Sequence, residues 1–228
     1  MKHTILIFAA LFLFSANIHA QYEPTTTWPY IYPDFVFGEL QKYKSGPVQG
    51  VYNIHLLHGT LHFIEGNMIQ EAKSSEIFSV RIAGDYYVNS GKGMMKVIAS
   101  EGDVYITESV EIDVVQLNST GGAYGASSAS SATTAFSSLE SIGTGVSGVN
   151  HMELKNSRDD GKTLPLIMKK YIVIPGCTVY ATRKDVSEVQ GIDSKDLTAF
   201  LKENKVKWKD AQSLLGLGMF LNDRINKK

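Results

Sequence analysis

The sequence is poor in the features that usually identify a function. Its 228 residues contain one cysteine, Cys177, so neither an internal disulfide nor a cysteine-based zinc site can form. The 22 basic and 23 acidic residues nearly balance, which argues against the clustered basic excess of a nucleic-acid-binding surface. No G-x-S-x-G, H-E-x-x-H or P-loop motif occurs. These absences exclude a disulfide-stabilised scaffold and a nucleic-acid partner. They also mean that none of these known catalytic motifs points to an activity.

The only long hydrophobic run lies at the N-terminus. Lys2 precedes residues 5–16, which carry no charge and include one polar residue. A run of twelve residues is too short to span a bilayer, which needs roughly twenty. Ile18 and Ala20 then place an aliphatic and a small residue where a signal peptidase expects them. We therefore predict a signal peptide over residues 1–20, cleaved after Ala20, and a secreted protein (periplasmic or extracellular) that does not span a membrane after cleavage.

What the sequence does contain is a regular series of short β-strand patterns. Hydrophobic residues make up 43% of the chain and charged residues 20%, as in globular domains. Turn signals recur about every eight to twelve residues between residues 35 and 116, which is typical of an antiparallel sheet. The predicted strands are 35–43, 47–57, 60–65, 68–73, 76–83, 86–89, 94–100 and 104–116. We predict a β-meander over residues 21–116 that closes into a partial barrel or a sandwich.

The composition changes abruptly after this sheet. Of the 34 residues 117–150, 24 are Ser, Gly, Ala or Thr, and only Glu140 is charged. Such a stretch buries too little apolar area to offset its ordering entropy, so we predict a flexible insertion over residues 117–160. A G-x-G-x-x-G match at residues 143–148 lacks the preceding strand and following helix of a dinucleotide site, and we interpret it as accidental.

Residues 161–228 are predicted to complete the same domain. A β-hairpin is expected from residues 164–174 and 178–182, which flank a Pro-Gly turn. Two helices follow, the first capped by Asp193 or Ser194 and the second by Asp210. The predicted fold class is mainly β (α+β), an antiparallel meander with a C-terminal helical pair.

Charge is distributed unevenly along the mature chain. Residues 21–182 carry 11 basic and 16 acidic groups, whereas residues 183–228 carry 10 and 7. Lysines cluster around Trp208 in the second part, at positions 202, 205, 207 and 209. This pattern favours a cationic helical end docked on an anionic sheet, with Trp208 packed inward, over a dedicated anionic partner.

The strongest candidate for a metal site is a pair of histidines. If His58 and Gly59 form a two-residue hairpin turn, His55 faces His62 across neighbouring strands. Opposed side chains stand about 4.5–5.5 Å apart at Cβ, close enough for two imidazoles to share a metal ion. In this register both histidines lie on the less apolar face of the hairpin, with Asn53 as the only polar neighbour. His55 and His62 are therefore low-ranking metal candidates, and a cross-strand surface pair is the favoured interpretation.

An aromatic segment, Trp28 to Phe35, follows the predicted cleavage site. We call it the aromatic arm. One interpretation is an adhesive or sugar-stacking arm that contacts an envelope protein or a glycan. The more common role of such a segment is to cover an open sheet edge or the end of a core.

Three stretches together resemble a known group of proteins. They are WPYIYPDF with the following VYNIHLLHGTLHFI, GGAYGASSASSAT, and the tail from TRKDV to FLKENKVKWKD. They are similar to uncharacterised exported β-rich proteins of Bacteroidota, and the resemblance spans most of the mature chain. It implies export and a β-rich fold but no activity, cofactor or site residue.

The sequence thus predicts an exported, non-catalytic binding or interaction protein of the cell envelope or exterior. No catalytic residue and no cofactor is predicted. The alternative is a metal-dependent or ligand-binding hydrolytic enzyme that uses His55 and His62.

Overall fold

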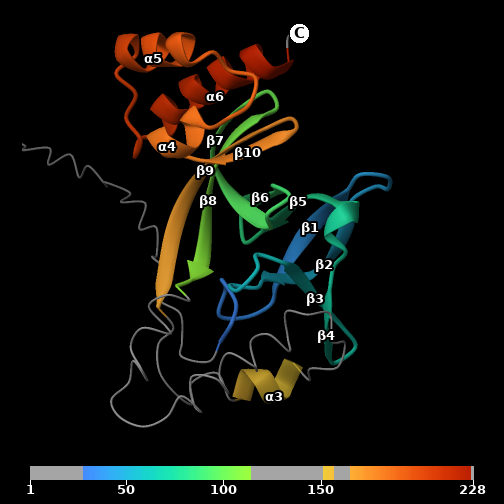
Figure 1. Ribbon diagram of the computed structural model, residues 1–228. Coiled ribbons are helices and arrows are strands. Elements are labelled where there is room, and N and C mark those ends of the chain that lie inside the picture. Colours follow the sequence, from blue (N-terminus) through green and yellow to red (C-terminus); the bar gives the residue numbers. More distant parts are fainter. Residues whose placement is uncertain (1–27, 114–150, 157–164, 227–228) are drawn as a thin grey trace, which may run out of the picture.

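The computed structural model describes residues 28–113, 151–156 and 165–226, and these form one curled sheet with the C-terminal helices at one end and the short helix of residues 151–156 at the other (Figure 1). Ten antiparallel strands make up a half-barrel, which confirms the predicted mainly β fold class. The strands are β1 (Val36–Lys42), β2 (Val48–Ile54), β3 (Leu61–Glu65), β4 (Met68–Glu71), β5 (Ile77–Ile82), β6 (Asp85–Asn89), β7 (Met94–Glu101), β8 (Val104–Ile112), β9 (Leu166–Ile174) and β10 (Cys177–Tyr180).

The order of the strands departs from a single meander at one place. The sheet runs β10-β9-β8-β7-β6-β5-β1-β2-β3-β4, so β5 pairs with β1 rather than with β4. The chain leaves β4, passes through a short 3₁₀ turn, η1 (Ser74–Glu76), and returns to lie beside β1. In this pairing Gly38 faces Ile82 and Leu40 faces Val80. The sheet therefore consists of two consecutive series of hairpins, β1–β4 and β5–β10, joined by one non-sequential pairing.

Four described helices accompany the sheet: α3 (His151–Asn156), α4 (Arg183–Ser187), α5 (Ser194–Glu203) and α6 (Ala211–Asn226). The predicted caps are confirmed, because the Asp193 side chain accepts from two N–H groups of α5 and the Asp210 carboxylate accepts from Ser213 N–H at 2.7 Å. Helix α3 lies within the predicted insertion, whereas residues 117–150 lie outside the described part. No described helix is long and apolar enough to cross a membrane.

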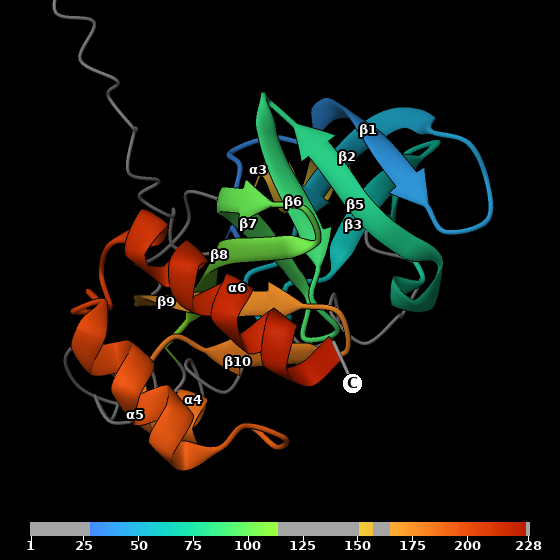
Figure 2. The same ribbon diagram turned by 90° about the horizontal axis from the view of Figure 1, so that it is seen from above.

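Helix α6 packs across β7, β8 and β9, as the view from above shows (Figure 2). Its buried face consists of Leu214, Leu215, Leu217, Gly218 and Leu221. A Cβ atom at Gly218 would lie 2.7 Å from Cγ1 of Val104, too close for a real contact. Glycine at this position therefore lets the helix approach the sheet.

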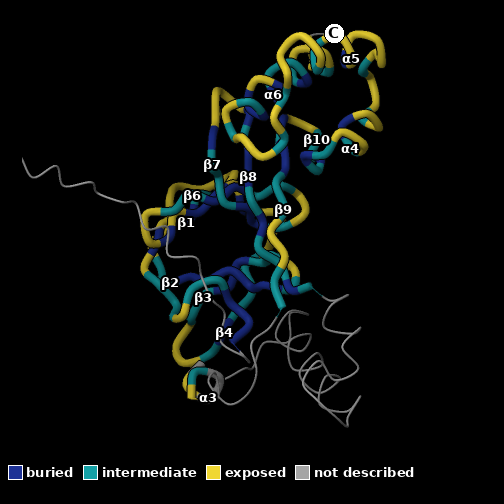
Figure 3. The backbone as a smooth tube through the Cα atoms, turned by 90° about the vertical axis from the view of Figure 1, so that its left-hand side faces the viewer, coloured by how far each residue is buried: buried dark blue, intermediate teal, exposed yellow. Residues whose placement is uncertain are grey.

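The core divides into two larger parts. The helical-end core joins α4, α5 and α6 to β7–β10, and its buried members are apolar throughout. The second core fills the inner face of β1, β2, β3, β5 and β6, with smaller clusters around Leu56 and Trp28. Figure 3 shows buried backbone where the strands meet and exposed turns along α5.

Candidate functional site

The aromatic arm and the histidine hairpin lie together in the structure. Tyr30 forms an isolated antiparallel bridge with His55, and Leu56 N–H donates to the Pro29 carbonyl at 2.7 Å. The side chains of Trp28 and Tyr30 are fully buried. This part of the arm therefore covers the end of a core, as the more common interpretation of such segments predicts.

The predicted register of the hairpin is wrong by two residues. His62 faces Asn53 rather than His55, and Leu61 faces Ile54. The turn is longer than two residues, because His55 N–H donates to the Thr60 carbonyl at 2.9 Å. A shift of two residues keeps side chains on the same face, so the two histidines remain neighbours. Their rings stack with centroids 5.2 Å apart and 12° between the planes.

The expectation of an exposed histidine pair is also wrong. Both His55 and His62 have no exposed surface, because the arm covers the face on which they lie. His62 Nδ1 lies 2.9 Å from the Tyr30 hydroxyl, and its Nε2 lies 3.0 Å from Thr60 Oγ1. Among the described residues, neither ring nitrogen of His55 has a hydrogen-bond partner.

Burial keeps both imidazoles neutral. It lowers the pKa of His55 to about 3, with smaller contributions from the nearby His62 and His58. Burial likewise lowers the pKa of His62 to about 4. A neutral imidazole can ligate a metal ion, so the protonation state alone does not exclude a metal site.

The surroundings of the pair are those of a packed core. A zinc site uses three or four ligands, and the described residues contain no group of three His, Cys, Asp or Glu side chains placed to hold a metal. Both nitrogens of His62 are already engaged. The structure thus brings the two candidate ligands together but gives them aromatic neighbours, Tyr30 foremost.

Asn53 fastens the arm to β2, a role that the sequence did not reveal. Its side-chain oxygen accepts from Tyr32 N–H at 3.0 Å and from Ile54 N–H at 2.9 Å. Its amide group donates to the carbonyls of Tyr32 at 2.8 Å and of Asp34 at 2.9 Å. An amide surrounded by apolar strand residues is the signal that could have indicated such a role, because a buried amide needs partners.

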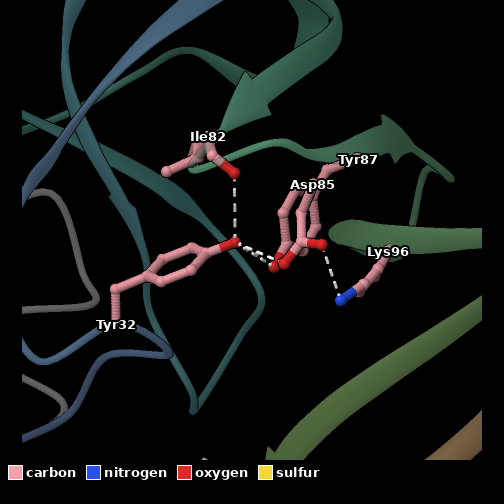
Figure 4. Close-up of polar contacts among 5 residues, drawn as sticks. All are labelled: Tyr32, Ile82, Asp85, Tyr87 and Lys96. Carbon is pink, nitrogen blue, oxygen red and sulfur yellow. Dashed lines mark hydrogen bonds and ion pairs between the residues drawn. The ribbon is translucent and has the colours of Figure 1, made fainter. Parts of the chain in front are cut away.

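A second polar cluster ties the arm to β5, β6 and β7 (Figure 4). The Tyr32 hydroxyl lies 2.9 Å from Asp85 Oδ2, 2.8 Å from the Tyr87 hydroxyl and 3.3 Å from the Ile82 carbonyl. Lys96 Nζ holds the other oxygen of Asp85 at 2.7 Å. Burial raises the pKa of Tyr32 and of Tyr87 above the ordinary tyrosine value. Both phenols therefore stay protonated and serve as hydrogen-bonding crosslinks.

An open hollow of about 600 Å³ lies where the turns of the two series of hairpins meet. We call it the aromatic hollow; its lining includes Tyr43, Phe78, Asn89, Lys92, Asp103 and Tyr105. The rings of Tyr43 and Phe78 pack at a centroid distance of 5.7 Å and are exposed by 59% and 37%. None of these residues was singled out from the sequence, because they come from four separate segments.

The two places differ in what they can do. Beneath the arm, hydrogen bonds connect one segment of the chain to another, and the rings face each other. At the aromatic hollow, rings and polar groups face solvent and can contact a ligand. Comparison of the chain with protein-family models, with curated proteins and with solved structures finds no match.

Proposed function

We propose that this chain is an exported, non-catalytic binding protein of the cell envelope or exterior, and that a neutral glycan is its ligand. The observation that carries the proposal is the exposed ring pair Tyr43–Phe78 in the aromatic hollow. Exposed aromatic rings pack against the apolar faces of sugar rings, while neighbouring polar groups bind the hydroxyls. Lys92 and Asp103 supply opposite charges beside the rings, which suits a neutral polar ligand.

The proposal places glycan stacking at the aromatic hollow rather than on the arm. Trp28 and Tyr30, which would be the best stacking platforms of the arm, are fully buried. Using them would require the arm to leave Asn53 and the histidine pair, at the expense of several buried hydrogen bonds. Tyr43 and Phe78 need no such rearrangement.

The test is a binding assay with the mature chain and defined glycans. We expect calorimetric titration with a panel of neutral oligosaccharides, and sedimentation with purified cell-wall glycan, to reveal binding by the wild type. The double variant Tyr43→Ala/Phe78→Ala should bind roughly 5- to 160-fold more weakly, since each lost ring contact removes roughly 0.5–1.5 kcal/mol. The matched control is Phe37→Ala, which removes an even more exposed ring (67%) outside the lining.

Two results would overturn the proposal. One is the absence of binding to any glycan of the panel, and the other is equal loss of binding in the double variant and in Phe37→Ala. The hydrolytic alternative has its own test, a thermal-shift series with EDTA and Zn²⁺. Strong stabilisation of the wild type by Zn²⁺, lost in His55→Ala, would favour a metal site at the histidine pair instead.

A further inference from the structure

A second hollow lies at the helical end and shares no lining residue with the aromatic hollow. It has a volume of about 510 Å³ and is formed between α4, α5 and the connection from α5 to α6. We call it the cationic hollow; it is lined by Arg183, Thr198, Leu201, Lys202, Lys205, Val206 and Trp208. Three of these residues are cations and none is acidic. The volume is within the range of small-molecule sites.

The three cations of the hollow lack ion-pair partners among the described residues. In the described part of the chain, none of Arg183, Lys202 and Lys205 takes part in an ion pair. Two acidic groups of the helical end, Asp196 and Asp210, are engaged elsewhere, since Asp196 pairs with Arg224 and Asp210 caps α6. Three like charges around one hollow repel each other unless an anion lies between them. The three charges therefore create a local positive potential that no ion pair of the described residues neutralises.

The backbone at Lys205 adopts a left-handed conformation that is unusual for lysine. Helix α5 ends in a Schellman motif, in which Val206 N–H bonds the Leu201 carbonyl at 3.4 Å. The left-handed position of this motif is occupied by Lys205, with φ +46°, although glycine adopts this conformation without strain. Lys205 thus lines the hollow at the expense of backbone strain. Strain of this kind points to a role for the side chain.

Trp208 gives the hollow an aromatic wall. It is partly buried against the helical-end core, so its position is fixed, and its accessible part lines the hollow. A flat ring beside cationic groups is suited to a ligand that has both a ring and a negative charge. Thr198 adds a hydroxyl group that can donate or accept a hydrogen bond.

We propose that the cationic hollow binds a sugar ring that carries an anionic group, either a carboxylate or a phosphate. The ring packs on Trp208, and the anionic group lies between Lys202, Lys205 and Arg183. This site is separate from the aromatic hollow and does not rest on the glycan proposed there. Its ligand differs in charge, because the lining has three cations and no carboxylate.

Tryptophan fluorescence provides a direct test. The chain has two tryptophans, and Trp28 is fully buried beneath other residues, so a ligand at the cationic hollow should change the emission of Trp208. We expect saturable changes with an oligogalacturonate or with glucose 6-phosphate, and the better of these two probes identifies the anionic group. The neutral sugar and inorganic phosphate serve as reference probes. The apparent affinity should fall as salt is raised.

Variants separate this site from nonspecific attraction to a basic surface. Lys202→Gln and Lys205→Gln should each weaken binding by roughly tenfold, as expected for loss of a charge-assisted contact. Lys209→Gln is the matched control, because it removes the same charge from the connection between α5 and α6 but lies outside the lining. All three positions are exposed, so thermal stability should change little.

Lys205→Gly tests the meaning of the strain. Glycine should raise the Tm by relieving the left-handed backbone, and it should weaken binding by removing the amine. Three results would overturn the proposal. They are the absence of a saturable signal with both charged sugars, equal affinity for the neutral sugar or inorganic phosphate, and equal weakening by Lys209→Gln. A raised Tm with unchanged affinity in Lys205→Gly would show that Lys205 does not contact the ligand.

Discussion

The two ends of the half-barrel are held together in different ways. At the helical end, α6 sets a face of leucines on apolar residues of β8 and β9, among them Ile106 and Ile172. Under the arm, Asn53, His55 and His62 are as deeply buried as any leucine. Apolar packing responds gradually to changes in volume, whereas a buried polar group depends on the presence of each partner and on its protonation state. The two ends should therefore respond to different perturbations.

The largest effect is expected at Asn53. Asn53→Asp replaces an amide that donates to two carbonyls with a carboxylate that faces them, in a site without exposed surface. We expect a loss of about 4 kcal/mol or more of unfolding free energy, measured by urea denaturation. The control is Asn204→Asp at the helical end, where the same change affects one exposed bond to the Phe200 carbonyl. Equal losses in both variants would contradict the difference between the two ends.

The next effect is a loss of stability in acid. The pKa values of His55 and His62 in the folded protein, about 3 and about 4, lie below the ordinary histidine value of 6.5. The unfolded chain therefore binds more protons than the folded one as the pH falls below about 6.5, and stability is lost with falling pH down to the folded pKa values. The slope should be about 1.4 kcal/mol per pH unit for each histidine.

This pH dependence can be assigned by comparing two variants. His55→Phe keeps a flat ring in the stack but removes one titrating group, so the slope of stability between pH 6 and 5 should fall by roughly half. His62→Phe removes the other titrating group of the pair and should lower the slope by a similar amount. The measurement is a series of urea unfolding curves across this pH range. An unchanged slope in His55→Phe would show that the stability is lost elsewhere.

The smallest effect distinguishes two glycines of α6. A Cβ atom at Gly216 would meet nothing within 4 Å, so Gly216→Ala should stabilise the protein by about 1 kcal/mol through helix propensity. At Gly218 the added carbon would clash with Val104, and Gly218→Ala should destabilise it by about 1–3 kcal/mol. Thermal unfolding of the two variants gives the comparison. Changes of the same sign would mean that α6 does not approach the sheet as closely as described.

Local patterns in the sequence predicted local structure well. The ends of the strands and the caps Asp193 and Asp210 could be read from turn residues and short-range spacing, because their causes lie within a few residues. The histidine pair was also placed on the correct face, since alternation in a strand survives a shift of two residues.

Features that depend on distant segments could not be predicted in this way. The turn after His55 was predicted to have two residues, but its true length depends on contacts that no local pattern shows. One of these contacts is the hydrogen bond that Met94 N–H donates to the Gly59 carbonyl at 2.7 Å. The burial of His62 depends on the arm, more than twenty residues earlier in the chain. The aromatic hollow likewise joins segments that only the completed sheet brings together.

The pairing of β1 with β5 has a consequence for the order of folding. Every other strand pairing joins consecutive strands, and all of these except β8–β9, whose connection spans residues 113–165, close short loops. Joining Leu40 to Val80 closes a longer loop than these short hairpins and should follow them. The arm comes later still, because it docks on a turn that itself contacts β8 through Ile112 N–H and the Leu56 carbonyl. Trp28 is therefore an internal reporter of the final kinetic step, in which the N-terminal segment closes over an otherwise assembled sheet.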